Sequence, residues 1–298
     1  MARKRGGRSI NGWLNLDKPA GLTSARAVAR VLAATDAVKA GHGGTIDPMA
    51  TGILPIALGE ATKTTAYAMD GVKTYRFTVA WGEARDTDDA EGAVIGTSDH
   101  RPGEADIRAA LGDFTGDIDQ TPPTYAAIKV DGQRAYKLAR LGKPAVMTPR
   151  RVRIDRLDLI SLVDDDHAML EMDCGKGVYV RSLARDLAIS LGTLGHVSQL
   201  RRTAVGAFLE VDAISLDKLE DLGHSAALFE HVRPVETALD DIPALAVTDQ
   251  QAARLKCGQA VHVLCNEPGM VRVTADGRLV ALAEVDDGMA KPVRVFNL

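Results

Sequence analysis

The residue best placed to do chemistry in this sequence is Asp47, which lies in the glycine-rich segment Gly-His-Gly-Gly-Thr-Ile-Asp-Pro at residues 41–48. The three glycines of this segment can adopt positive φ angles and allow another chain to approach closely, and Pro48 restricts Asp47 to extended geometry. We therefore predict that this segment, called the Asp47 loop below, holds the Asp47 carboxylate in one pose and that this carboxylate is the reacting group. The alternative is an ordinary turn, in which Asp, Pro and Gly are all common.

The glycines do not match a nucleotide-binding motif. No Gly-x-Gly-x-x-Gly follows a strand pattern, and residues 59–64 lack the Gly-Lys-Ser/Thr ending of a P-loop. The seven histidines and three cysteines show no His-x-x-x-His, Glu-x-x-His or Cys-x-x-Cys spacing. We therefore expect neither a metal nor a cofactor.

A second acidic group lies in residues 86–91 and contains Asp86, Asp88, Asp89 and Glu91. One interpretation is a divalent-metal site that could serve a phosphohydrolase. The spacing lacks the glycine and the terminal glutamate of an EF-hand loop, so a solvated turn is the simpler interpretation.

Basic residues are concentrated in residues 131–156, although the whole chain carries a net charge of −4. This segment, called the basic stripe below, contains two acids, Asp131 and Asp155, and two tyrosines lie nearby. The eight basic residues are Arg134, Lys137, Arg140, Lys143, Arg150, Arg151, Arg153 and Arg156. Such a cluster predicts a surface that follows a phosphate backbone, and the alternative is a solvated helix with its linker.

Hydrophobic periodicity predicts mixed strands and helices, and therefore an α+β fold. We expect strands at residues 13–16 and 75–81, the latter with one buried face, and two paired strands around the turn at 164–166. We expect helices capped by Thr23 or Ser24 and running to about 34, and at 104–111, 134–141 and 180–191, with an extended segment at 121–125.

After residue 239 the sequence pattern changes to one of short strands with a single short helix. This change predicts two domains, at 1–239 and 240–298. The second contains a helix at 250–256 and short strands near 261–264, 271–274 and 278–284. Asp276-Gly277 between two apolar runs predicts a β-hairpin.

We expect a soluble cytoplasmic protein with no membrane contact. No apolar run of 18 residues is present, and residues 2–8 are basic where a signal peptide would be apolar. The three cysteines form no motif, which fits reduced thiols.

With these motifs in order, nearly the whole chain resembles the bacterial TruB family of tRNA pseudouridine synthases. The resemblance rests on residues 14–24, with their Lys-Pro-x-Gly, on the Asp47 loop through residue 56, on 86–89, 121–139 and 177–183, and on Leu-Arg-Arg at 200–202. Ile46 and Met49 stand where leucines are usual in the family. The resemblance implies a mixed or antiparallel sheet core flanked by helices, an RNA-binding thumb at 120–150 and a small β-rich PUA-like domain at 240–298.

The resemblance also implies a role for individual residues. Asp47 becomes the essential aspartate, and Arg181 pairs with it and with Asp89. Residues that contact the flipped nucleotide or line its pocket are His42, Tyr75, Tyr179 and Leu200. Lys18 supports the first motif, and the basic stripe supplies RNA contacts through Arg134, Lys137, Arg140, Arg150 and Arg151. From the residues alone, Tyr75 could be an ordinary core aromatic, Arg181 a surface arginine and His42 a satisfied loop histidine.

The substrate implied by the resemblance is uridine 55 in the T stem-loop of tRNA, which is flipped out of its stack and isomerised to pseudouridine. The resemblance also implies that the protein acts as a monomer and needs no cofactor and no protein partner. Asp47 could act as a nucleophile on the base or on the sugar, or as a base that removes a sugar proton, and the sequence leaves these routes open. A non-catalytic RNA-binding protein is the rival interpretation from a different class.

Overall fold

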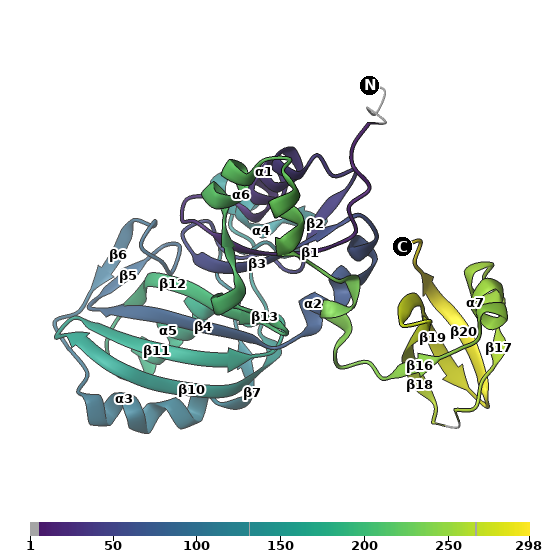
Figure 1. The fold of residues 1–298 in the computed structure, drawn as a ribbon. Coiled ribbons are helices and arrows are strands. Elements are labelled where there is room, and N and C mark those ends of the chain that lie inside the picture. Colours follow the sequence, from purple (N-terminus) through teal and green to yellow (C-terminus); the bar gives the residue numbers. More distant parts are fainter. Residues whose placement is uncertain (1–5, 131, 266) are drawn as a thin grey trace.

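A mixed β-sheet of 11 strands forms the larger part of the computed structural model, which describes residues 6–130, 132–265 and 267–298 (Figure 1). Asp131 of the basic stripe and residues 1–5 of the basic N-terminus lie outside the described residues. The strands of the main path are, in order, β14 (Ile214–Ser215), β1 (Gly12–Lys18), β3 (Thr51–Leu58), β12 (Gly195–Val205), β4 (Lys73–Trp81), β11 (His167–Cys174), β10 (Arg150–Asp164) and β7 (Gly116–Gln120). Three further strands pair at its sides: β2 (Ala40–His42), β13 (Phe208–Leu209) and β15 (Val232–Arg233). Parallel pairing of β12 with β3 and of β14 with β1 makes the sheet mixed, which confirms the predicted α+β core.

Most of the helices flank this sheet, and the last α-helix lies on the C-terminal sheet described below (Figure 1). The α-helices are α1 (Ser24–Thr35), α2 (Thr65–Asp70), α3 (Glu104–Ala110), α4 (Ala135–Arg140), α5 (Val180–Ser190), α6 (Leu216–Leu222) and α7 (Asp249–Lys256). The 3-10 helices are η1 (Gly59–Thr64), η2 (Leu111–Phe114), η3 (Glu210–Asp212), η4 (Ala226–His231) and η5 (Val235–Leu239). Two small hairpins complete the set: β5 (Glu83–Arg85) with β6 (Val94–Thr97), and β8 (Lys129–Val130) with β9 (Gln133–Arg134).

The helices that position the site begin and end where local chemistry predicts. The Thr23 side chain accepts a hydrogen bond from the backbone N–H of Arg26 and caps α1. Helix α5 buries Leu183 and Leu187 in the main core and ends before Gly192, whose φ of 72° suits glycine.

The predicted strands lie where they were expected, but the burial of β4 was underestimated. β10 and β11 pair antiparallel around the aspartate turn, as predicted. β4 was expected to bury one face, yet Thr78 and Ala80 are buried as well as Phe77 and Val79. The reason is that β4 lies in the middle of the sheet, between β12 and β11, so that side chains of neighbouring strands flank its residues on both sides.

Sequence patterns did not predict β12, although it lies at the centre of the sheet and pairs with β3 and β4. Its sequence, Gly-His-Val-Ser-Gln-Leu-Arg-Arg-Thr-Ala-Val, mixes polar residues into both faces and hides the alternation that marks a strand. Its strand character is therefore decided by its neighbours.

The C-terminal residues form a separate five-stranded sheet, which lies to the right of the large sheet in Figure 1. Its order is β16 (Ala244–Ala246), β18 (Gly269–Ala275), β19 (Arg278–Asp286), β20 (Met289–Val295) and β17 (Val261–His262). Asp276 and Gly277 have φ angles of 47° and 73°, which confirms the predicted hairpin. β16 and β20 were not predicted, although Asp287-Gly288 repeats the same turn chemistry with φ angles of 46° and 69°.

A shared hydrophobic cluster joins the two sheets. Trp13 and Phe208 of the large sheet pack in one cluster with Leu279, Leu282 and Phe296 of the C-terminal part. Next to the cluster, the Lys63 ammonium donates to the Val295 carbonyl at 2.8 Å, and the Asn297 N–H donates to the Glu60 carboxylate at 2.7 Å. The C-terminal sheet is thus docked on the larger one through apolar packing with a polar rim.

Replacing Phe296 by alanine is expected to lower the free energy of unfolding by about 3–5 kcal/mol, the usual cost of removing a fully buried phenylalanine. Phe296, which directly follows β20, is 0% exposed, and Val293 on β20 is 39% exposed and serves as the matched control in Val293→Ala. Denaturant unfolding of both variants measures the difference. Equal losses in the two variants would contradict the docking described here.

Within the described residues, no helix combines the length and apolar character needed to cross a membrane.

Candidate active site

The Asp47 loop connects β2 to β3 and is held by backbone hydrogen bonds at several points. The Gly43 N–H donates to the Pro55 carbonyl at 2.8 Å. The Ser24 hydroxyl, at the first position of α1, accepts from the Ile46 N–H at 3.0 Å and donates to the Ile46 carbonyl at 3.2 Å. Gly44 has a φ of 123°, a conformation that other residues rarely adopt. The loop next to Asp47 is therefore fixed by α1 and β3 together.

Arg181, in the first turn of α5, grips the Asp47 carboxylate with two nitrogens. Its Nε lies 2.9 Å from Oδ2 and its Nη2 lies 3.0 Å from Oδ1. The two side chains differ in exposure, at 4% for Arg181 and 31% for Asp47. A bidentate pair of this kind orients the carboxylate while leaving part of it open to a substrate.

Arg181 also gathers groups from two other segments. Its Nη1 donates to the Thr87 carbonyl at 2.9 Å, its Nη2 donates to the Tyr125 carbonyl at 3.2 Å, and its Nε lies 3.5 Å from the Asp89 carboxylate. Burial alone would lower the pKa of Arg181, but the nearby carboxylates, Asp47 first, raise it on balance. The guanidinium therefore remains charged at the centre of the cluster.

The acidic turn is not the solvated turn that the simpler interpretation proposed. Asp89 is 4% exposed and accepts a hydrogen bond from the Thr87 hydroxyl at 2.6 Å. Asp88, with a φ of 60°, pairs with Arg185 at 2.8 Å, and burial raises the pKa of Asp88 despite that cation. The buried Asp89 and the partly buried Asp88 are paired with arginines. No three His, Cys, Asp or Glu side chains in the described part of the chain gather to hold a metal ion.

Arg185 was missed by sequence reasoning, although its spacing contained a signal. It lies four residues after Arg181, on the same face of α5. Its Nη2 donates to the Thr121 carbonyl at 3.0 Å, and the Ser182 hydroxyl donates to the same oxygen at 2.8 Å. Helix α5 thus holds the start of the segment at 121–125 as well as the acidic turn.

Two tyrosines lie around this cluster. Tyr75 is half-buried on β4, directly opposite Arg202 on β12, and burial raises the pKa of the Tyr75 hydroxyl. Tyr179 precedes α5, and both of its backbone polar groups bond to the Gln120 side chain, at 2.8 and 3.1 Å. Burial raises the pKa of Tyr179, and the negative charge of Asp47 adds to the rise. The Tyr179 hydroxyl therefore lies close enough to Asp47 for the carboxylate charge to act on it.

The structure places Leu200 and His42 on the strands around the site. Leu200 is 6% exposed in the main core and lies opposite Phe77. His42 is half-buried at the end of β2, and its Nδ1 accepts from the Gly44 N–H at 3.3 Å. Burial, helped by the charge of Arg202, lowers the pKa of His42. The Gly44 contact is the kind expected for a satisfied loop histidine.

Two buried cations lie under the Asp47 loop. Lys18 is 0% exposed and donates to the carbonyls of Pro19 at 2.8 Å and Pro48 at 3.2 Å. Burial lowers the pKa of Lys18 to about 8. Arg202, which sequence reasoning did not single out, is 1% exposed and donates to three carbonyls of the loop region. A signal for Arg202 was present in the sequence. Adjacent residues of a strand point to opposite faces of the sheet, so one arginine of the Arg201-Arg202 pair must point to the face that is buried here.

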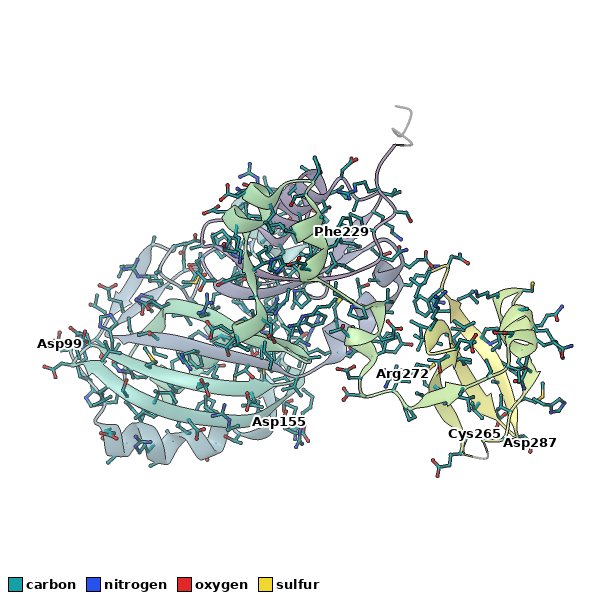
Figure 2. All side chains as sticks on the ribbon, viewed as in Figure 1. Asp99, Asp155, Phe229, Cys265, Arg272 and Asp287 are labelled. Carbon is teal, nitrogen blue, oxygen red and sulfur yellow. The ribbon has the colours of Figure 1, made fainter. Side chains whose placement is uncertain are left out.

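The basic stripe divides into two parts in the structure. Arg134, Lys137, Arg140 and Arg150 are exposed, and the charges of Arg150 and Arg134 reach Tyr179, where they oppose the rise in its pKa. The remaining arginines lie among acids on β10 and its neighbours: Arg151 is 3.7 Å from Asp119, Arg153 is 2.6 Å from Asp155, and Arg156 contacts Asp158, Glu171 and Asp173. Figure 2 shows Asp155 at the β10–β7 edge of the sheet. The stripe is therefore not one continuous uncompensated surface.

Solved structures identify the fold. One described as an H/ACA RNP bound to a substrate RNA containing 2'-deoxyuridine has a TM-score of 0.75 and 21% identity, covering 100% of this chain and 94% of that chain. A Cbf5–Nop10–Gar1 complex has a TM-score of 0.74 and 23% identity, covering 99% of this chain and 92% of that chain. The chain therefore has the fold seen in Cbf5.

Family models narrow this fold to a class of enzyme. Residues 30–180 match the N-terminal domain of the TruB family pseudouridylate synthases, residues 181–240 the C-terminal domain of tRNA pseudouridylate synthase B, and residues 242–297 the C-terminal region of tRNA pseudouridine synthase II. The class is that of the pseudouridylate synthases, which are isomerases.

Relatives agree over the full length of the chain. The tRNA pseudouridine synthase B of Caulobacter vibrioides is 54% identical, covering 100% of both chains, and that of Bradyrhizobium diazoefficiens is 55% identical, covering 99% of this chain and 88% of the relative. The chain belongs to the TruB family of pseudouridylate synthases, which confirms the resemblance seen in the sequence.

Proposed function

We propose that this protein isomerises uridine 55 in the T stem-loop of tRNA to pseudouridine, with Asp47 as the essential reacting group. The observation that carries the proposal is the bidentate Asp47–Arg181 pair, in which a buried guanidinium orients a carboxylate that is 31% exposed. The full-length relatives named tRNA pseudouridine synthase B support tRNA as the substrate.

The reaction suits a site with one activated carboxylate. The N1–C1′ bond of the uridine breaks, the uracil turns, and C5 joins C1′, while the C5 hydrogen leaves as a proton and N1 takes up a proton. All other atoms are retained, so the isomerisation needs no external reactant. Asp47 acts as a nucleophile on the base or the sugar, or as a base on the sugar, and its fixed pose serves each route.

Reaching the uridine requires that it leave its stack, at a cost of a few kcal/mol. Stacking on Tyr75 would return about 1–3 kcal/mol, the range found for bases on aromatic side chains. In this proposal Tyr179 and Leu200 line the pocket, and His42 lies beside the extruded nucleotides. Lys18 and Asp89 support the reacting pair.

The RNA-binding surfaces are assigned on the same basis. Residues 120–150 form the thumb, since between β7 and β10 the described residues of this range contain only the short β8, β9 and α4. Residues 1–239 form the catalytic domain and residues 240–298 a PUA-like domain, which includes the five-stranded sheet. The protein acts in the cytoplasm as a monomer without a protein partner.

Release of hydrogen from C5 tests the proposed function directly. An unmodified T-arm stem-loop labelled at uracil C5 is incubated with the protein, and release of the label in step with pseudouridine formation is expected. Binding without release would favour the non-catalytic RNA-binding protein. Loss of activity in excess chelator would favour the metal-dependent alternative.

Reversing two thumb charges, in the double variant Lys137→Glu and Arg140→Glu, is expected to weaken tRNA binding and flatten its salt dependence. Each phosphate contact contributes about 0.7–0.9 to the slope of log K against log salt, so two lost contacts change it by about 1.4–1.8. Binding titrations at several salt concentrations measure the slope. The control is Arg101→Glu with Arg108→Glu, two arginines that pair with Asp166 and Glu104. Equal slopes in both double variants would show that the thumb charges do not contact RNA.

A further inference from the structure

Arg202 is a buried arginine that donates hydrogen bonds to the Asp47 loop and to the strand that follows it. Its Nε donates to the Ile53 carbonyl at 2.7 Å, its Nη1 to the Thr45 carbonyl at 3.1 Å, and its Nη2 to the Gly44 carbonyl at 3.2 Å. These three carbonyls lie on both sides of Asp47 in the sequence. One planar guanidinium therefore ties the middle of the Asp47 loop to strand β3.

The charge of Arg202 is not used in an ion pair. Its neighbour Arg201 pairs with Asp17 and Glu210, whereas among the described residues no carboxylate pairs with Arg202, which is 1% exposed. Buried arginines are normally paired with acids, because desolvating the charge is costly. Here carbonyl dipoles take that role, and the choice of partners fixes the loop backbone at the same time.

The backbone of Arg202 is also fixed. Arg202 pairs with Gly52 of β3 and lies opposite Tyr75 of β4. Gly52 has a φ of 101°, and a Cβ at this position would lie 2.1 Å from the Arg202 carbonyl oxygen. The glycine thus allows β12 to approach β3 closely enough for the guanidinium to reach the loop. Arg202 sits between the Asp47 loop and the proposed stacking tyrosine.

We propose that Arg202 is a positioning residue for the isomerisation, which ties the Asp47 loop to β3 through the carbonyls of Gly44, Thr45 and Ile53 and so sets the carboxylate for reaction. The inference rests on the proposed function. Arg181 orients the carboxylate itself, and Arg202 orients the backbone that carries it. Arg202 touches neither the Asp47 carboxylate nor the substrate in this scheme.

The test compares Arg202→Lys with the matched control Arg201→Lys. Lysine keeps the positive charge, but its donors lie on one nitrogen and do not form the planar fork that spans these three separated carbonyls. We expect kcat for C5 hydrogen release to fall by about 100-fold in Arg202→Lys, the scale of loss for a small misplacement of a reacting group. The Kd for the T-arm stem-loop should stay close to the parental value, whereas the melting temperature should fall modestly because buried carbonyls lose a donor. The control should keep the parental kcat.

Backbone NMR gives a readout that does not depend on activity. The amide signals of Gly44, Thr45 and Ile46 should shift in Arg202→Lys and not in Arg201→Lys. A folded Arg202→Lys with parental kcat would overturn the proposal, as would unshifted loop amides. If the wild-type protein itself releases no C5 hydrogen, the proposed function fails, and the loop amides still decide whether Arg202 holds the loop.

A measurement on the wild-type protein covers the case in which Arg202→Lys does not fold. In protein labelled with nitrogen-15 arginine, a guanidinium bound to three carbonyls rotates slowly and protects its N–H groups from exchange. We expect separate, protected Nη signals for Arg202. A single averaged, rapidly exchanging signal would overturn the proposal.

Discussion

The variant Asp47→Asn is expected to lose at least about 10⁴-fold in kcat for C5 hydrogen release, the upper range of loss for a residue that transfers protons or attacks the substrate. Asparagine has nearly the same shape as aspartate, but its amide carries no negative charge and neither attacks carbon nor accepts a proton at neutral pH. The loss should therefore be chemical rather than structural.

The surroundings of Asp47 indicate that this variant will fold. Arg181 would keep the Asp89 carboxylate at 3.5 Å and the carbonyls of Thr87 and Tyr125, so its buried charge would not be left without partners. The asparagine side-chain carbonyl can still accept one bond from the guanidinium. We expect tRNA binding and the melting temperature to remain close to those of the parent.

The matched control is Asp70→Asn, which removes an exposed carboxylate that pairs with Lys176 at 2.7 Å. Single-turnover assays of both variants, with tRNA binding measured in parallel, separate chemistry from affinity. Parental turnover in Asp47→Asn would remove Asp47 from the mechanism. Loss of tRNA binding together with turnover would assign it to recognition instead.

The second large effect is expected for Arg181→Lys, which keeps a positive charge but removes the bidentate hydrogen bonding to Asp47. Lysine could contact one carboxylate oxygen and could not at the same time donate to the Thr87 and Tyr125 carbonyls. We expect kcat to fall by about 10²–10³-fold, typical of losing a preorganised charged donor in an active site. Binding should weaken less than kcat falls.

Removing the charge altogether, in Arg181→Met, should also destabilise the fold. Asp89 is 4% exposed and would lose its cation, and breaking a buried pair in this way costs about 3–5 kcal/mol. Denaturant unfolding measures the loss. Arg30→Lys is the control, because Arg30 makes the same two-pronged contact with Glu220 at 2.6 and 2.5 Å but on the surface. A similar small change in both proteins would contradict the central role of Arg181.

Elements with strong local signals could be predicted from the sequence. The Thr23 cap, the leucine spacing of α5 and the Asp276-Gly277 turn each depend on residues a few positions apart, and each lies where it was expected. β12 and β20 were missed. Their residues become strands because adjacent strands supply the hydrogen-bond partners, and a one-dimensional pattern does not contain those partners.

The candidate site shows the same division. The sequence alone determined that Asp47 would lie in a restrained loop, since glycine and proline restrict the backbone through their own covalent structure. The family resemblance implied that Arg181, 134 residues away, pairs with this carboxylate, and the tertiary structure supplies the contacts that form the pair. Only the tertiary structure decided that Arg202 lies beneath the loop backbone. The sequence pattern around an arginine does not show whether its side chain is exposed or buried. The neighbouring strands, which desolvate the charge and supply its partners, decide between those two fates.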